Sequence, residues 1–462
     1  MNKSDSERIA GMLNNLGFKN TTNPDSADLI IFNLCSVRQS AIDRATSKIK
    51  NFAKSKCQNP NVKSSSKSKI LLTGCILNKN RRKLEEFCDG TFKIDEIREL
   101  PSILEKIGFK GLNKNETEIK HYLDIMPEYE LSPTACVPIM TGCNNFCSYC
   151  VVPYTRGREV SRSVEDILYE VKNLVHPVRE SKGIGCSKKS DFSNGVKQGV
   201  KEIWLLGQNV NSYGIKPKIK NTKAKTTTQK SKMINFADLL KMVNDIDGDF
   251  WVRFTSSHPK DLTDEMIDVF AKCQKITPYL NLPIQSGDNE VLKAMNRPYS
   301  VEDYKKLIKK VRSAFKKYRK GQESVVFLST DAIVGFPGET RKQFQNTKKI
   351  FKEIGFSAGY ISLYSPRHQS TAFKLKDNIS PSEKHKRKKE LVKILEKSAL
   401  DFNKKFLNKE VKCLILEKRD DMYIGKTKHY QTIRIRSNKD ILGQFVKVKI
   451  DKIEAFRLFA KT

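Results

Sequence analysis

The sequence predicts an α/β protein in three parts: an open α/β N-terminal domain, a partly closed parallel barrel of six β/α units, and a small C-terminal β-barrel. Three patterns predict them. Short apolar runs of buried-strand type stand near the N-terminus, strand-like runs alternate with helical periodicity in the middle, and short alternating runs end the chain. We place the parts at residues 1–118, 129–396 and 399–462 of the 462-residue chain.

The first part contains two apolar runs that predict buried parallel strands, Leu29–Asn33 and Ile70–Thr73, separated by a helical stretch over Ile42–Ala53. Cys35 and Cys75 stand just after these strands. Ligands of open α/β sheets collect beyond the carboxyl ends of the strands, so we expect both thiols to face one crevice. They form a candidate metal site, and the alternative is two buried cysteines that pack as small hydrophobic side chains.

The middle part predicts six β/α units, which imply a parallel barrel. Its strands are expected at Ala135–Met140, Glu202–Leu206, Trp251–Thr255, Tyr279–Ile284, Val325–Val334 and Gly359–Leu363. Its helices are expected at Val164–Val175, Phe236–Ile246, Asp264–Cys273, Val301–Tyr318 and Arg341–Ile354. Polar and glycine-rich residues follow the strands, and in such barrels the loops after the strands build the active site.

A C-x3-C-x2-C motif, made of Cys143, Cys147 and Cys150, follows the first of these strands. Three thiolates at this spacing can hold three irons of a [4Fe-4S] cluster, which leaves the fourth iron open to a small molecule. The alternatives are a structural zinc site, which needs a fourth closing ligand, and a disulfide with a spare thiol, which suits an oxidising compartment. The motif favours an iron–sulphur site that performs chemistry.

The charge and the cysteine content indicate which class of partner and which cellular compartment suit this chain. The start, Met1–Arg8, lacks an apolar signal region, and no apolar run is long enough to span a bilayer. Eleven cysteines in such a chain favour metal ligation in a reducing cytoplasm. The net charge of +34 favours an anionic polymer as partner. Lysine is spread through every segment, so a lysine-rich composition is the alternative explanation.

Two stretches, near 177–198 and 215–232, interrupt the strand–helix alternation. They are rich in Lys, Ser, Gly and Thr and poor in apolar residues, which predicts surface insertions. Cys186 lies in the first of them, and we expect it, like Cys57 and Cys88, to have no role at a metal site.

After a basic helical connector over Ser382–Phe406, the chain predicts a small β-barrel of OB-like size. Its strands are expected at Val411–Glu417, Met422–Ile424, Thr432–Arg436, Phe445–Ile450 and Ala455–Phe459. Basic side chains at outward positions suit a nucleic-acid strand, and the alternative is a merely solvated face. These side chains are Arg434, Arg436, Lys447 and Lys449.

The runs Gly142–Cys150 and Val152–Glu159 resemble the radical S-adenosylmethionine (SAM) methylthiotransferases of the MiaB type, which modify tRNA. The resemblance covers essentially the whole chain apart from the insertions. It continues through Leu206–Tyr213, Leu282–Gly287, Thr330–Thr340 and Tyr364–Arg367. The family arrangement of a methylthiotransferase domain, a radical SAM barrel and a C-terminal TRAM barrel fits the three parts.

The resemblance implies that Cys143, Cys147 and Cys150 hold a [4Fe-4S] cluster that reduces SAM to a 5′-deoxyadenosyl radical. It implies a second [4Fe-4S] cluster, with Cys35 and Cys75 among its ligands, as the sulphur source. The product would be a 2-methylthio group on N6-(dimethylallyl)adenosine next to the anticodon. The implied partners are the tRNA anticodon stem-loop and an electron donor such as flavodoxin or ferredoxin, and we expect a monomer. Loop position alone assigns SAM contacts to Gly207, Gln208, Asn209, Ser256, Gln285 and Asp331.

The chain departs from the family in three places. Family members carry a first N-terminal cysteine in the run Gly-Cys-Gln-Met-Asn, whereas this chain starts at Met1-Asn2. We expect a truncation that removes one cluster ligand and the first strand, with a cysteine codon two triplets before Met1 in the upstream DNA. Asn281 replaces a histidine, and His368-Gln369-Ser370 replaces Pro-Gly-Thr.

Three other functions stay open at this point: methylthiolation of threonylcarbamoyl-adenosine in tRNA, methylthiolation of a ribosomal-protein aspartate, and RNA binding without sulphur transfer. The segments Gln285–Gly287 and Tyr364–Arg367 favour the prenyl-adenosine subgroup. The basic charge favours RNA over protein as substrate.

Overall fold

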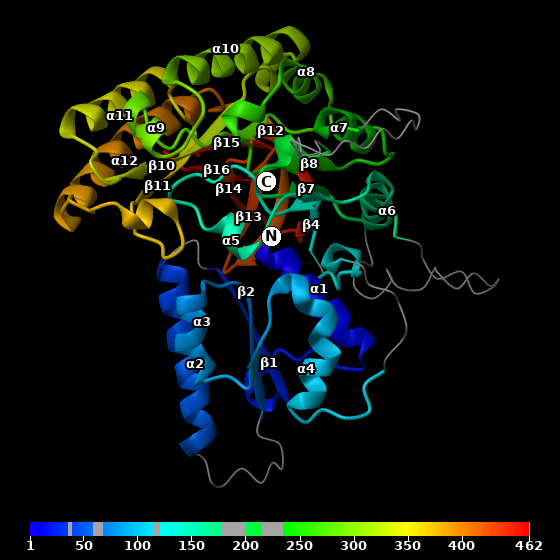
Figure 1. Cartoon of the computed structure of the whole chain (residues 1–462). Coiled ribbons are helices and arrows are strands. Elements are labelled where there is room, and N and C mark those ends of the chain that lie inside the picture. Colours follow the sequence, from blue (N-terminus) through cyan, green and yellow to red (C-terminus); the bar gives the residue numbers. More distant parts are fainter. Residues whose placement is uncertain are drawn as a thin grey trace, which may run out of the picture.

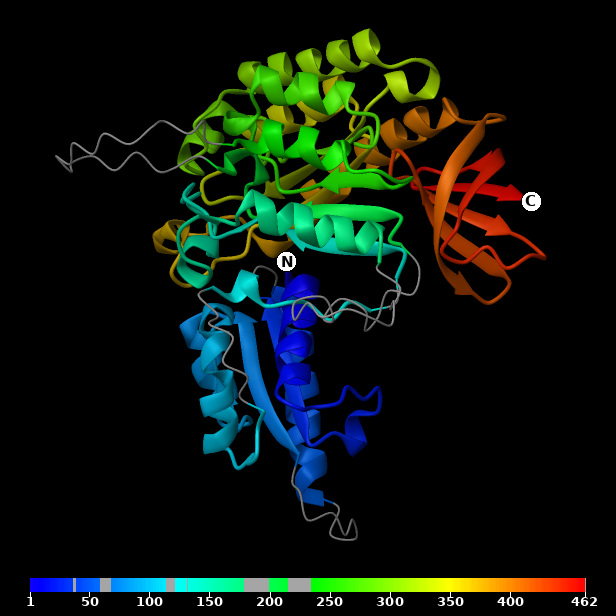
Figure 2. The same cartoon turned by 90° about the vertical axis from the view of Figure 1, so that its right-hand side faces the viewer.

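The computed structural model describes residues 1–35, 39–58, 68–113, 121–130, 132–177, 199–214 and 234–461, with the side chains of helix α2 (Gln39–Gln58) given from 41 to 53. Cys186, the Cys57 side chain and nearly all of the two expected insertions lie outside these residues. Figure 2 shows an N-terminal block (blue) below a central barrel and a C-terminal barrel (orange and red) at its side. The α/β class and the three-part order are therefore confirmed.

The N-terminal block is a parallel sheet between two layers of helices (Figure 1). Its strands are β1 (Leu29–Cys35), β2 (Lys69–Cys75) and the short β3 (Gly90–Thr91), which the sequence did not predict. Helices α1 (Asn2–Asn15) and α4 (Leu100–Lys106) cover one face, and α2 and α3 (Asn78–Glu85) cover the other. Each layer has its own apolar core against the sheet, in which β2 is almost fully buried and β1 is mostly half-buried.

The central barrel joins two three-stranded parallel sheets, β4-β7-β8 and β9-β10-β11. A parallel bridge between Val252 and Ile276 connects them, so six strands form one open wall. The strands are β4 (Thr134–Pro138), β7 (Glu202–Leu206), β8 (Trp251–Phe254), β9 (Tyr279–Asn281), β10 (Phe327–Val334) and β11 (Ala358–Leu363).

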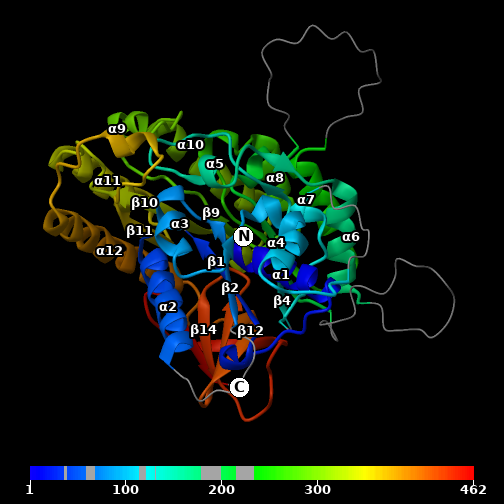
Figure 3. The ribbon, with the colours of Figure 1, turned by 60° about the horizontal axis from the view of Figure 1, so that its bottom comes forward.

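Amphipathic helices surround this wall in an arc (Figure 3). They are α6 (Val164–Val175), α7 (Phe236–Asn244), α8 (Asp264–Lys272), α10 (Val301–Tyr318), α11 (Arg341–Ile354) and α12 (Pro381–Lys404). Their apolar faces share one continuous core with the strands. The segments with predicted helical periodicity therefore form helices in the structure. The short helix α9 (Asn289–Ala294) was not predicted.

Several strand predictions were too long by one to three residues, and proline explains one of them. The strand expected at Tyr279–Ile284 ends at Asn281, because Pro283 has no N–H to donate to the ladder. The strand expected at Ala135–Met140 stops at Pro138. The chain resumes as β5 (Met140–Thr141), which pairs antiparallel with β6 (Val160–Ser161).

The C-terminal barrel closes in the order β12-β13-β14-β16-β15. Its strands are β12 (Glu410–Arg419), β13 (Met422–Thr427), β14 (Thr432–Arg436), β15 (Phe445–Ile453) and β16 (Arg457–Lys461). The turn between β13 and β14 inserts into the base of the central barrel, where Tyr430 packs against the rings of Trp204 and Tyr279. The two barrels therefore form one packed unit.

Arg253 is the centre of this contact. Its side chain is fully buried, ion-pairs with the buried Glu202, and donates hydrogen bonds to the backbone carbonyls of Thr427 and Lys428, both at 2.9 Å. The rings of Trp204 and Trp251 lie beside the guanidinium, 5.7 and 5.4 Å from it. A planar guanidinium suits such a site because it can donate in several directions and stack on aromatic faces.

No helix among the described segments is both long and apolar enough to cross a membrane.

We expect Arg253→Met to lower the free energy of unfolding by about 3–5 kcal/mol, because Glu202 would stay buried without a counter-charge. Urea unfolding followed by tryptophan fluorescence measures the effect locally, since both tryptophans of the chain contact Arg253. The control is Arg419→Met, which breaks the exposed pair with Glu417 and should cost less than about 1 kcal/mol. Equal effects of the two substitutions would contradict the central role of Arg253.

Candidate active site

The cysteine triplet lies on the loop between β5 and the short helix α5 (Val152–Thr155), at the carboxyl end of the first barrel strand. The loop starts at Gly142, whose φ of +76° favours glycine, and a Cβ there would overlap the carbonyl oxygen of Arg158. Glu159 accepts hydrogen bonds from the backbone and side-chain nitrogens of Asn144, both at 3.3 Å. The loop is therefore closed on itself through backbone and side-chain contacts.

The segment after α9 holds the other side of the loop. The Ser148 backbone N–H donates to the Met295 carbonyl at 3.0 Å, and the Asn296 amide donates to the Phe146 carbonyl at 2.9 Å. Arg297 donates to the Cys147 sulphur at 3.4 Å. Helix α9, which the sequence did not predict, thus positions the residues that fix the triplet.

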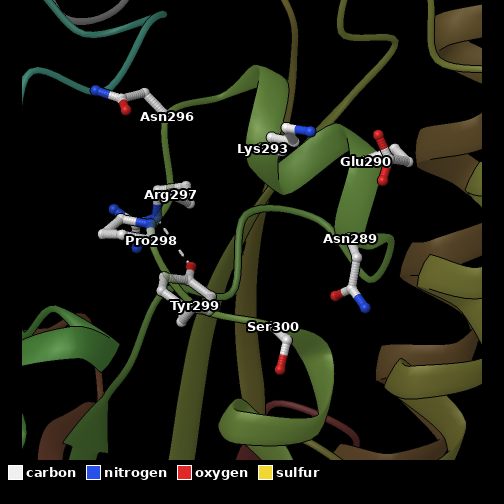
Figure 4. A pocket seen from close by; sticks show the side chains of 8 residues that line it. All are labelled: Asn289, Glu290, Lys293, Asn296, Arg297, Pro298, Tyr299 and Ser300. Atoms are coloured by element: carbon white, nitrogen blue, oxygen red, sulfur yellow. Dashed lines mark hydrogen bonds between the residues drawn. The ribbon is translucent and has the colours of Figure 1, made fainter.

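Figure 4 shows this segment lining a pocket of about 370 Å³. The Arg297 Nε donates to the Tyr299 hydroxyl at 2.9 Å, so the two side chains form one unit beside the loop. Tyr299 also donates to the Ile284 carbonyl at 3.0 Å, which ties the unit to the end of β9. The pocket is bounded by Asn289, Glu290, Lys293 and 296–300.

The three thiols of the triplet are shielded from water. Burial raises the pKa of Cys143 to about 11 and the pKa of Cys150 to about 12. Both thiols are therefore protonated at neutral pH in the metal-free protein, and metal binding would release their protons. The donor set suits an iron–sulphur cluster in its chemistry, with three sulphur ligands on one loop and the Arg297 donor at one of them, and the three side chains would have to turn toward one another to bind it.

Cys35 and Cys75 are register partners at the ends of β1 and β2, so the prediction that they meet at one crevice agrees with the strand pairing. Arg156 donates to the Cys75 sulphur at 2.7 Å and ion-pairs with Asp5. Burial raises the pKa of the Cys75 thiol, against the opposing effect of the Arg156 charge. Arg156 follows the triplet in the chain, so it connects the two cysteine sets.

The N-terminal pair does not complete a four-iron site with the side chains present. Among the described residues, no three His, Cys, Asp or Glu side chains are gathered closely enough to hold a metal ion as they stand, and this holds for the Cys143, Cys147 and Cys150 side chains as well. A four-iron cluster with one open iron needs three protein ligands. Cys35 and Cys75 supply two of them.

The residues assigned to SAM by loop position fall into two groups. Gly207, Gln208 and Asn209 follow β7, and the Ser256 carbonyl after β8 accepts from the Val210 N–H at 3.3 Å. The Gln285 N–H donates to the Asp331 carbonyl at 2.8 Å, which joins the segment after β9 to β10. All six lie at the carboxyl ends of barrel strands or just inside them. Their individual contacts with SAM stay predictions.

Two departures from the family keep their local geometry. Asn281, in place of histidine, still reaches Asp331, with its amide nitrogen 3.3 Å from a carboxylate oxygen. Gln369 stands at the position of the family glycine and adopts a left-handed φ of +78°. Gln369 thus adopts a backbone conformation that glycine adopts easily, and it does so at a conformational cost.

Sequence reasoning missed three functional candidates, Arg156, Arg297 and His258. Each is buried, and its importance depends on contacts with residues distant in the chain. Burial of a charged or titratable side chain can be read only from a structure. The sole sequence signal belonged to Arg156, which lies within the run Val152–Glu159 that resembles the family.

Family models match three stretches of the chain. They are the Uncharacterized protein family UPF0004 over residues 1–92, the Radical SAM superfamily over 191–351 and the TRAM domain over 404–462. The chain is 36% identical to the tRNA-2-methylthio-N(6)-dimethylallyladenosine synthase of Clostridium tetani, over 99% of this chain and 93% of that protein. It is 37% identical to the protein of the same name from Carboxydothermus hydrogenoformans, over 99% and 96%.

Solved structures are more distant. The radical S-adenosylmethionine methyltransferase TsrM from Kitasatospora setae matches with a TM-score of 0.46 and 12% identity, over 78% of this chain and 65% of that one.

We expect Gly142→Ala to bind little iron after anaerobic reconstitution, because the new Cβ would displace the loop at Arg158. The matched control is Gly157→Ala. Gly157 has a similar φ of +73° but open space at the Cβ position, so its substitution costs only about 1–2 kcal/mol of backbone strain. Iron and sulphide assays with the visible absorbance of the cluster measure the difference. Equal iron content in the two variants would contradict the role of the Gly142 turn.

Proposed function

We propose, from the premise that this chain belongs to the MiaB-type tRNA methylthiotransferases, that it adds a 2-methylthio group to N6-(dimethylallyl)adenosine in tRNA. The reaction replaces an aromatic C–H bond of adenine, which offers neither an acidic proton nor a leaving group to acid–base catalysis. One-electron cleavage of SAM at a [4Fe-4S] cluster supplies the radical chemistry that this bond requires.

The placement of the cysteine triplet carries the proposal. Cys143, Cys147 and Cys150 would hold the cluster, on a loop that Arg297 and Asn296 fix from the opposite side. The loops after β7, β8, β9 and β10 open at the same end of the barrel, where active sites of parallel barrels lie. The cysteine loop and the loops after the barrel strands would thus hold the cluster, SAM and adenine together at the carboxyl ends of the strands.

The opposite end of the barrel is closed by protein. The turn carrying Tyr430 fills the base, and Arg253 and Trp204 occupy the barrel interior above it. Among the described residues, the base of the barrel is thus closed to substrate, and we expect substrate to enter from the carboxyl ends of the strands. A closed base restricts the access of water from that side, which protects a reactive radical from side reactions.

Cys35 and Cys75 would serve sulphur transfer rather than SAM cleavage. Arg156, which follows the triplet in the chain, contacts this pair through the Cys75 sulphur and also pairs with Asp5. We assign both thiols to the sulphur-supplying site of the N-terminal block. A protein of the flavodoxin or ferredoxin type would reduce the cluster, and we expect a monomer in the cytoplasm.

The RNA-binding face that we propose lies on β14, β16 and β15 of the C-terminal barrel. Phe459 is the register partner of Arg434 on one side and of Lys452 on the other. The Lys452 ammonium lies 5.1 Å from the Phe459 ring. An outward aromatic side chain between two cations offers a base a stacking surface and its phosphates a counter-charge. Lys447 and Lys449 lie farther along β15, and both are exposed.

Cysteine substitutions test the two proposed sites separately. Cys143→Ala should form neither 5′-deoxyadenosine nor methylthio-adenosine, because the cluster loses a ligand. Cys75→Ala should still form 5′-deoxyadenosine but give no methylthio product, and Cys88→Ala should form both. Mass spectrometry of nucleosides from tRNA incubated with SAM and reductant measures both products. If the unsubstituted protein made 5′-deoxyadenosine without any methylthio nucleoside, the proposed function would be wrong.

Phe459→Ala should weaken tRNA binding about 5- to 100-fold at fixed ionic strength, because one stacked base contributes about 1–3 kcal/mol. Lys452→Gln should weaken binding less and reduce the salt dependence of log Kd by about one charge. The control is Tyr169→Ala, an exposed aromatic residue on α6. Filter binding at several salt concentrations measures all three. Unchanged affinity in Phe459→Ala would place the RNA elsewhere.

A further inference from the structure

Four buried polar atoms for which the described residues offer no hydrogen-bond partner lie in two adjacent loops of the central barrel. They are the side-chain oxygens of Gln208, Asn209 and Ser257 and the Nε2 of His258. The loops follow β7 and β8 and are joined by the bond from Val210 N–H to the Ser256 carbonyl. Buried polar groups in proteins are nearly always paired, so a group of unpaired atoms at one place indicates a missing partner.

His258 is the most restrained of the four. Only 5% of the residue is exposed, and its backbone N–H donates to the Asn211 side-chain oxygen at 3.0 Å. Its Nδ1 accepts a hydrogen bond from the Lys260 backbone N–H at 3.3 Å. A neutral imidazole that accepts at Nδ1 carries its proton at Nε2. The unpaired atom is therefore an N–H donor in a fixed ring.

The imidazole is held neutral by its surroundings. Burial lowers the pKa of His258 to about 2, and the nearby charges of Arg297 and Lys260 act in the same direction. A neutral donor suits the nitrogen and oxygen acceptors of a nucleoside. It also avoids adding a further positive charge beside SAM, whose sulphonium is cationic.

His258 lies next to the unit that holds the cysteine loop. Its ring meets the Tyr299 ring edge-on, with centroids 5.8 Å apart. Tyr299 accepts from Arg297, and Arg297 donates to the Cys147 sulphur. Tyr299 and Arg297 thus lie between His258 and the Cys147 sulphur along this series of contacts, and the methionyl group of SAM, which would meet the cluster, would lie at the cysteine end. The Nε2–H of His258 would therefore be available to the nucleoside half of SAM.

We propose that His258 is a cofactor-binding residue whose Nε2–H donates a hydrogen bond to an acceptor on the nucleoside half of SAM. This inference rests on the proposed function only in requiring SAM as cofactor, and it does not depend on sulphur transfer. The unpaired oxygens of Gln208, Asn209 and Ser257 are further contacts available to the same ligand.

The test compares two buried histidines by substitution with phenylalanine. His258→Phe removes an Nε2 donor for which the described residues offer no partner, but also the Nδ1 acceptor of the Lys260 N–H, so the melting temperature of the SAM-free form should fall only slightly. SAM should bind about 10- to 100-fold more weakly. His429→Phe is the matched control. Its Nε2 lies 3.1 and 3.0 Å from the Gln322 and Val325 carbonyls, so its loss should lower the melting temperature and leave SAM affinity unchanged.

A second variant covers the case in which phenylalanine does not fit. His258→Gln keeps an N–H donor at a similar reach, and it should recover part of the lost SAM affinity. Equilibrium dialysis of SAM with anaerobically reconstituted full-length protein gives the affinities, with 5′-deoxyadenosine and methionine as separate competitors. Competition by 5′-deoxyadenosine should weaken in step with SAM binding, and competition by methionine should not change.

SAM binding by His258→Phe and His258→Gln that equals the unsubstituted protein would overturn the inference. Loss of tRNA binding with unchanged SAM binding would also overturn it, because the donor would then serve the substrate. Iron content is measured in each variant to separate cofactor binding from cluster loss. Should the unsubstituted protein bind SAM yet yield no methylthio nucleoside, the proposed function would fail while the His258 result still held.

Discussion

The guanidinium of Arg156 fixes the spacing between the two cysteine sets on which the proposed chemistry depends. It donates to the Cys75 sulphur at 2.7 Å and pairs with the buried carboxylate of Asp5. A planar guanidinium can satisfy both groups only in a narrow range of positions. Because Arg156 follows the triplet in the same segment, any shift of the cysteine loop would break a buried ion pair in the N-terminal block. Such pairs are costly to break.

Helix α1 is the other half of this connection, since it contacts the central barrel at two points. Asp5 pairs with Arg156, and one turn later Arg8 pairs with Glu170 of α6, with both side chains fully buried. Arg8 also donates to the Ile125 carbonyl at 2.9 Å. A rigid helix that is fixed at two points cannot rotate about either. The N-terminal sheet is thereby oriented toward the mouth of the barrel.

The sequence predicted what periodicity and local spacing determine. Helices α6, α10 and α11 have the predicted bounds, because long amphipathic runs with a Ser or Thr cap carry a strong local signal. The triplet was found because its ligands are contiguous in sequence. Helix α9 is only six residues long, too short for a periodic signal. The roles of Arg297 and His258 depend on which loops meet in space, and no local pattern contains that information.

Arginine and lysine have different roles in this chain, so the net charge of +34 does not by itself describe how the chain would recognise RNA. Within the described residues, every ion pair with both side chains less than a tenth exposed uses arginine. Lysines are mostly exposed, and their long-range attraction for RNA is screened by salt and carries no sequence information. Recognition of one nucleoside must therefore depend on a few positioned side chains. The proposed side chains at the carboxyl ends of the barrel strands fit that role better than the overall charge.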